Sequence, residues 1–231
     1  MDMSQSHLAP SAQPSNLSGR PTVFVIDEDV IRRNWLGLLA IRSGWEVEVF
    51  ECAERFLARP PTVSPCCLVL DFGRSDVGGL ELQRRLSDRP ELPIIFLCSG
   101  HDVRSAVSAM KAGAVEVLTA PLSDGAVQAA ICDAIERSRA SLARRLTLDM
   151  LRSRYASLSS REREVMALVV RGRLNKQIGA DLGISEITVK AHRGKMMRKM
   201  AGRTVPDIVN MAAKLFPRDS NFATGTTAFP F

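Results

Sequence analysis

Short apolar runs alternate with amphipathic stretches through residues 21–139. The runs that we take as strands are Thr22–Ile26, Glu46–Phe50, Cys67–Leu70, Ile94–Cys98 and Val115–Leu118. Stretches between them, such as Val30–Ser43, carry apolar residues at helical spacing on one face. Strands that alternate with helices are typical of a parallel sheet covered on both faces. The pattern therefore predicts an α/β domain over residues 21–139.

A longer helical pattern follows this domain, from Asp124 to about Arg154. Apolar residues recur there at the spacing of one helix face, at Val127, Ile131, Ile135, Leu142, Leu146 and Met150. We expect the first of them to pack on the sheet domain. Beyond residue 139 the apolar stripe extends past that domain, so residues 140–156 are predicted to form a helical linker that suits a dimer seam.

Residues 157–216 have the pattern of an all-α domain with four helices. The sequence SSRE that starts at Ser159 fits a capping box and begins the first helix. Asn175 and Ser185 are predicted to cap the second and third helices, and Gly202 is predicted to end the third. The fourth covers Val205–Leu215, with a proline in its first turn.

The two ends of the chain are polar. Residues 1–20 contain Ser and Pro but no apolar core of a signal peptide, so they predict a disordered leader. Residues 217–231 predict a flexible tail. No apolar run approaches the length of a membrane span, and the five cysteines form no C-x-x-C pair. We therefore expect a cytoplasmic protein with no membrane partner and no zinc site.

Positively and negatively charged residues are distributed unevenly along the chain. Its net charge is +6, but residues 141–203 contain 15 Lys and Arg against five Asp and Glu, a net charge of +10, and the remainder carries −4. A strongly basic segment beside a mildly acidic one favours a polyanion as the partner of the basic segment.

Acidic side chains follow two of the predicted strands. Asp27 and Glu28 come directly after the first strand, Asp71 after the third, and Ser99 after the fourth. In a doubly wound sheet the carboxyl ends of the strands line one edge, so these residues can meet there. Clustered carboxylates need a cation, and hard oxygen ligands suit Mg²⁺. A carboxylate beside Mg²⁺ can accept a phosphoryl group.

The stretches VFVIDEDVIRRNWL, CLVLDFGRSDVGGLELQRRL, PIIFLCSGHDV and AVSAMKAGAVEVLTAP resemble the receiver domain of response regulators over residues 21–139. The resemblance implies a flavodoxin-like, doubly wound five-stranded parallel sheet of strand order 2-1-3-4-5. It makes Asp71 the phosphoacceptor, and Asp27 and Glu28 the acidic pair that holds Mg²⁺. It also makes the carbonyl of Gly73 a metal ligand and Ser99 the switch hydroxyl.

The sequence departs from the receiver pattern at four positions that matter. Glu28 replaces the usual second Asp, and Ser75 replaces the usual Pro after the acceptor. Ala120 replaces the Lys that pairs with the phosphoryl group, and Val117 replaces the aromatic switch residue. Two hypotheses follow. In one, a sensor histidine kinase phosphorylates Asp71; in the other, a degenerate receiver acts as a dimerisation or interaction module without phosphorylation.

A basic helix after a tight turn is the strongest signal in the chain. The second and third helices of the all-α domain meet at Gly183-Ile184-Ser185, the form of a helix-turn-helix whose second helix enters the major groove. Val189, Met196 and Met200 share the predicted core face of that helix. Small and basic residues occupy the opposite face, where they can approach bases and phosphates.

The segment NKQIGADLGISEITVKAHR resembles the LuxR-type DNA-binding domain of FixJ/NarL-class response regulators. From this resemblance and from the helix face, we predict DNA contacts by Lys176, Thr188, Lys190, Ala191, Arg193, Gly194, Lys195 and Arg198. The chain is thus predicted to be a two-component transcription regulator that binds promoter DNA as a homodimer and acts with RNA polymerase. It is not predicted to be an enzyme, since Asp71 is followed by Phe72 and not by the second Asp of an aspartyl-phosphate phosphatase.

Overall fold

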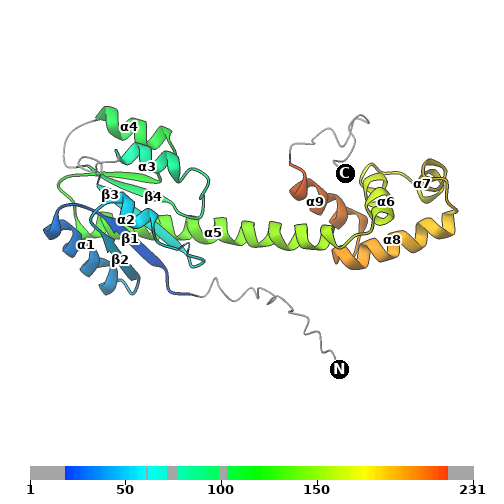
Figure 1. Cartoon of the computed structure of the whole chain (residues 1–231), viewed down its shortest axis with the longest axis horizontal. Helices are drawn as coiled ribbons and strands as arrows, with labels where there is room; N and C mark the ends of the chain where they lie inside the picture. The colour runs from blue at the N-terminus through cyan, green and yellow to red at the C-terminus, as the bar shows by residue number, and fades with distance from the viewer. Residues whose placement is uncertain (1–18, 61, 72–77, 99–102, 218–231) are drawn as a thin grey trace, which may run out of the picture. The chain divides into compact units, whose positions relative to one another are not determined.

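The computed structural model describes residues 19–60, 62–71, 78–98 and 103–217. The chain divides into two compact units, residues 1–144 and 145–231, and each is described here by itself (Figure 1). The predicted leader up to residue 18, the tail from residue 218, and the predicted site residues Gly73 and Ser99 lie outside the described residues.

Five parallel strands form the sheet of the first unit. They are β1 (Thr22–Ile26), β2 (Glu46–Phe50), β3 (Cys66–Asp71), β4 (Ile94–Cys98) and β5 (Glu116–Thr119). Their order is β2-β1-β3-β4-β5, all parallel, which confirms the predicted fold class. The predicted strand bounds hold to within one residue. β1, β3 and β4 are buried along their whole length, as central strands covered on both faces should be.

Helices cover both faces of this sheet. They are α1 (Val30–Arg42), α2 (Ala53–Leu57), α3 (Gly79–Arg85), α4 (Val103–Lys111) and α5 (Asp124–Ala156). One core joins the sheet to α1 and α5, through buried residues such as Leu36 and Ile131. A second core joins the opposite face to α2, α3 and α4, through Phe56, Leu82 and Ala109.

Helix α5 confirms the predicted long helix. It runs for 33 residues without a break, although its last part belongs to the second unit. Val127 and Ile131 are buried in the sheet core, whereas Leu146 and Met150 are exposed by 39% and 49%. Its role as a dimer seam stays a prediction. Among the described residues, no helix combines the length and apolarity needed to cross a bilayer.

The second unit contains α6 (Ser160–Val170), α7 (Asn175–Leu182), α8 (Glu186–Met200) and α9 (Val205–Leu215). A single core joins them, formed by residues that include Val165, Ile178, Val189, Met196 and Ile208. This agrees with the four helices and with the core face of the third that the sequence predicts. The capping box at Ser159 and the cap at Ser185 are also confirmed.

Two predicted helix ends are wrong. Asn175 is the first residue of α7 and not its cap, and the N–H of Leu174 at the cap donates to Gln177 Oε1 at 3.0 Å. At the end of α8 the left-handed residue is Ala201, with φ of 57°, and not Gly202. Gly202 serves packing instead, because a Cβ there would lie 2.5 Å from Ile208 Cδ1.

Candidate acidic site and nucleic-acid interface

Two carboxylates meet at the carboxyl edge of the sheet. Asp27 directly follows β1, and Asp71 is the last residue of β3, the neighbouring strand. Both residues are buried, with exposed fractions of 1% and 4%. The fold therefore brings these two predicted site residues together at the edge where ligands bind in doubly wound sheets.

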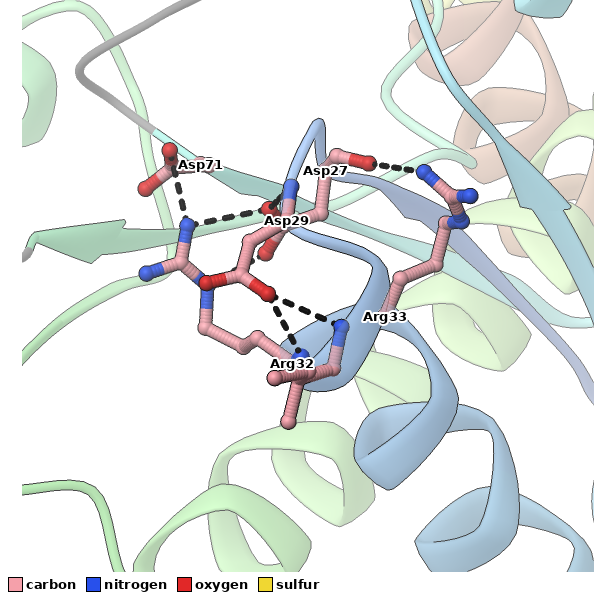
Figure 2. Close-up of polar contacts among 6 residues, drawn as sticks. Asp27, Asp29, Arg32, Arg33 and Asp71 are labelled. Atoms are coloured by element: carbon pink, nitrogen blue, oxygen red, sulfur yellow. Dashed lines mark hydrogen bonds and ion pairs between the residues drawn. The ribbon is translucent and has the colours of Figure 1, made fainter.

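A guanidinium lies between the two carboxylates (Figure 2). Arg32 Nε donates to Asp27 Oδ2, and Arg32 Nη2 donates to Asp27 Oδ1 at 3.0 Å. The same Nη2 lies 2.8 Å from Asp71 Oδ2. Asp27 Oδ1 also accepts from the N–H of Asp29 at 2.8 Å. Two parallel donors on one carboxylate form the strong, fork-like arrangement that arginine favours.

Asp71 is less completely compensated than Asp27. Arg32 Nη2 lies 2.8 Å from Asp71 Oδ2 as an ion pair, and Asp71 Oδ1 has no hydrogen-bond donor among the described residues. Burial raises the pKa of the Asp71 carboxyl above its ordinary value, while Arg32 lowers it and Asp27 raises it further. Asp71 is thus a buried carboxylate whose negative charge is costly, with Oδ2 paired to Arg32 and Oδ1 without a donor among the described residues.

The other predicted metal ligands do not join this pair in the described structure. Glu28 is exposed, and Gly73 and Ser99 lie outside the described residues. Asp27 and Asp71 offer the oxygen chemistry that Mg²⁺ prefers. Arg32, however, holds both oxygens of Asp27, and the described residues contain no group of three or more potential ligand side chains. The residues therefore do not fit Mg²⁺ while Arg32 is in place.

The turn between α7 and α8 depends on two glycines. Gly183 ends α7 in the left-handed conformation, with φ of 65°. Gly179 faces the turn directly, since a Cβ there would lie 2.8 Å from the carbonyl oxygen of Ile184. This close approach of α7 to the turn fixes where α8 begins. Ser185 then caps α8 by accepting from the N–H of Thr188 at 3.2 Å.

The outer face of α8 is basic and exposed. Lys190, Lys195 and Arg198 are exposed along it, and Ala191 and Gly194 are exposed between them. A Cβ at Gly194 would meet no atom within 4 Å, so this position is open. Spacings of three and four residues place the set on one side of the helix. Cations beside small residues suit close approach to a polyanion.

The remaining residues predicted to contact DNA differ in their exposure and in the hydrogen bonds that their side chains already make. Lys176 is exposed in the first turn of α7. Thr188 lies within 2.8 Å of the Ser185 hydroxyl, so it takes part in the cap of α8. Arg193 is half-buried, and its Nη1 donates to Asn175 Oδ1 at 2.5 Å. Arg193 thus ties α8 to α7 in this conformation.

Known proteins resemble this chain over most of its length. Residues 23–132 match the family described as the response regulator receiver domain, and residues 156–212 match the bacterial regulatory proteins of the luxR family. Nodulation protein W of Bradyrhizobium diazoefficiens is 38% identical over 199 residues, which cover 86% of this chain and 88% of that protein. The chain belongs to the response regulators with a LuxR-type DNA-binding domain.

Other members of this response regulator family support the assignment. Transcriptional regulatory protein FixJ of Rhizobium meliloti is 38% identical over 192 residues, which cover 83% of this chain and 94% of that protein. Among solved structures, the response regulator StyR is 38% identical and has a TM-score of 0.75, covering 85% of this chain and 100% of that one. Both resemblances that the sequence indicated are confirmed.

Family membership settles the class of function. The protein is a two-component response regulator and a transcription factor, and its family does not consist of enzymes. The receiver family typically uses Mg²⁺ for phosphorylation, and the two domains imply DNA and a kinase as general partners.

Sequence reasoning missed two residues at these sites. Arg32 lies in a stretch for which the sequence predicts only an amphipathic helix, although its place five residues after Asp27, in the first turn of α1, allows it to fold back. Ile187 is 80% exposed near the start of α8. Its spacing of three and four residues from Lys190 and Ala191 puts it on the same face and is the signal that would have found it.

Proposed function

We propose that this response regulator binds promoter DNA by placing α8 in the major groove, as a homodimer. The observation that carries the proposal is the exposed face of α8, where Lys190, Lys195 and Arg198 flank Ala191 and Gly194. Cations at the flanks reach phosphates, while small residues let the helix backbone approach base edges. The exposed Ile187 suits contact with a thymine methyl group.

The receiver unit supplies the regulation. Asp71 is proposed to accept a phosphoryl group from a sensor histidine kinase, because it is a buried carboxylate at the carboxyl edge of the sheet whose Oδ1 has no donor among the described residues. Residues 140–156 are proposed to link the receiver-like residues 21–139 to the DNA-binding residues 157–216. Exposed Leu146 and Met150 give that helix an apolar surface for a dimer seam. RNA polymerase is the proposed partner at the promoter, in the cytoplasm.

A second candidate is regulation without phosphorylation. Arg32 already contacts both carboxylates, and Ala120 stands where a cation would pair with the phosphoryl group. In that case the receiver unit acts only as a dimerisation or interaction module. The two candidates share the DNA-binding function and differ in whether Asp71 matters.

The DNA-binding function is tested by fluorescence anisotropy of the full-length protein on duplexes from its own upstream region, across a salt series. The logarithm of the DNA affinity is expected to fall linearly with the logarithm of the salt concentration. The reason is that Lys and Arg side chains on phosphates displace the counterions of the DNA. Lys190→Ala should reduce the slope by about 0.9 if Lys190 meets one phosphate. An affinity that does not respond to salt would remove the proposal.

Phosphorylation is tested by mass spectrometry of the intact protein after acetyl phosphate treatment. A labile adduct is expected in the wild type and not in Asp71→Asn. Promoter activity in cells should then change in Asp71→Asn. No adduct, together with unchanged promoter activity in Asp71→Asn, would favour the phosphorylation-independent candidate.

A further inference from the structure

The acidic site of the receiver unit contains a cation that belongs to the chain itself. The side chain of Arg32 is 20% exposed, whereas the side chains of its partners Asp27 and Asp71 are 1% and 5% exposed. Buried carboxylates that share a site repel each other unless a positive charge lies close by. Arg32 provides that charge from within the fold (Figure 2).

The loop after β1 holds Arg32 in this position. Asp29 caps α1 by accepting from the N–H groups of Ile31 and Arg32, at 2.8 and 3.2 Å. The N–H of Asp29 itself donates to Asp27 Oδ1 at 2.8 Å. The same few residues therefore fix one carboxylate and the backbone that carries the guanidinium. Little conformational freedom remains to be lost when the ion pairs form.

A divalent cation would need the oxygens that Arg32 occupies. Both oxygens of Asp27 accept hydrogen bonds from the guanidinium, and Asp71 Oδ2 lies 2.8 Å from Nη2. A cation placed between these carboxylates would also meet the fixed positive charge of Arg32. The two cations therefore compete for one site.

We propose that Arg32 is the resident counter-ion of the acidic site, and that a divalent cation binds Asp27 and Asp71 only when the guanidinium leaves. The inference deepens the proposed function, since it concerns the input at Asp71. It makes the acidic site partly neutralised at rest and weakly responsive to Mg²⁺.

The test is isothermal titration of MgCl₂ into the full-length wild type, Arg32→Gln and Arg42→Gln. Arg42 is the matched control, because it lies exposed in the last turn of the same helix and carries the same charge. Arg32→Gln should bind Mg²⁺ about tenfold more tightly than the wild type, as expected for removal of charge-assisted hydrogen bonds. Arg42→Gln should match the wild type, and adding Asp27→Asn to Arg32→Gln should abolish the gain.

Loss of Arg32 leaves two buried carboxylates without compensation, so a folding check is required. Thermal unfolding followed by the fluorescence of Trp35 and Trp45 should show Mg²⁺ stabilising Arg32→Gln more than the wild type. If Arg32→Gln does not fold, Arg32→Lys keeps the charge but lacks the fork, and should bind Mg²⁺ with intermediate affinity. Equal Mg²⁺ affinity in the wild type and the folded Arg32 variant, or no Mg²⁺ binding in that variant, would overturn the proposal.

The same proteins separate this inference from the proposed function. Their DNA affinity, measured by anisotropy in EDTA, should be equal in the wild type, Arg32→Gln and Arg42→Gln. Intact DNA binding, with equal Mg²⁺ affinity in the wild type and Arg32→Gln, would contradict only the proposed role of Arg32. Absent DNA binding in every protein, with the expected gain in Mg²⁺ affinity, would sink only the proposed use of α8.

Discussion

The acidic edge of the sheet and the basic face of α8 differ in whether their charged side chains are buried or exposed to solvent. At the sheet edge the carboxylates are buried, and Arg32 pairs with both Asp27 and Asp71 from within the fold. On α8 the cations stay in solvent, and the ion pair of Lys190 with Glu186, at 3.4 Å, is itself exposed. Buried charges must be compensated inside the fold, whereas exposed charges cost little and remain for a partner. Buried pairing thus marks a controlled site, and solvent-exposed charge marks a binding face.

The largest expected effect is the loss of DNA affinity when the exposed cations of α8 are removed. The triple variant Lys190→Ala, Lys195→Ala, Arg198→Ala should lose more than about 100-fold in DNA affinity at physiological salt and about 2.7 in salt slope, if each cation meets a phosphate. Anisotropy titration measures both. The matched control removes three exposed cations from the receiver unit, with Arg84→Ala, Arg85→Ala and Lys111→Ala. An equal loss in the control would mean that net charge, and not α8, governs binding.

The next effect concerns the turn that positions α8. Gly179→Ala should cost about 2–3 kcal/mol of folding free energy in the second unit, because its Cβ would press on the Ile184 carbonyl oxygen at 2.8 Å. Urea unfolding followed by the methyl NMR signals of Met196 and Met200 reports on this unit alone. Unfolding of the receiver unit, followed by Trp fluorescence, should not change. A second unit of unchanged stability would show that the turn adapts to the added methyl group.

A buried carboxylate in the second unit provides a counterpart to Asp71. Glu162 is 3% exposed, and it accepts from Lys199 Nζ at 2.7 Å and from the N–H of Ser159 at 2.9 Å. The hydrogen bond from Lys199 lowers the pKa of Glu162 below its ordinary value of 4.5, helped by the Ser159 N–H. Its charge therefore stabilises the fold above pH 4.5, and this contribution is lost as the pH falls through the lowered pKa.

Glu162→Ala should accordingly cost about 1–2 kcal/mol at neutral pH, through loss of the cap and the ion pair. Glu162→Gln keeps an acceptor for the Ser159 N–H and should cost less. The advantage of the wild type over Glu162→Gln should vanish at acid pH. Methyl NMR of urea unfolding at several pH values checks this, and a difference that persists at acid pH would contradict the assigned role of the charge.

The smallest expected effect comes from Gly194, which, unlike Gly179, has room for a side chain. Gly194→Ala should stabilise the second unit by up to about 1 kcal/mol, since alanine favours helix and meets no atom within 4 Å. If α8 approaches DNA closely, the same change should weaken DNA affinity. Stability and affinity would then move in opposite directions. A stabilised protein with unchanged DNA affinity would place Gly194 away from the interface.

Most elements could be predicted because their signals are local. β1, β2 and β4 have the predicted bounds, and in β1 and β4 the apolar run reflects burial of the strand's own residues. The capping box that begins α6 depends on side chains three residues apart. Where a helix end depends on packing, as at Ala201 and Gly202, the local pattern failed. Packing against Ile208 leaves no room for a Cβ at position 202, so the glycine is needed there. The left-handed residue is therefore the preceding one, Ala201.

The sequence by itself determined the architecture, the family and the basic helix, because periodicity, caps and motif residues act over a few positions. Only the tertiary structure decided which charges meet. Arg32 looks like any arginine near a helix start until β1 and β3 lie side by side and bring Asp71 within 2.8 Å. Glu162 and Lys199 likewise meet only when α6 packs on α8. Ion pairs between distant segments depend on where the whole chain places them, which no local pattern encodes.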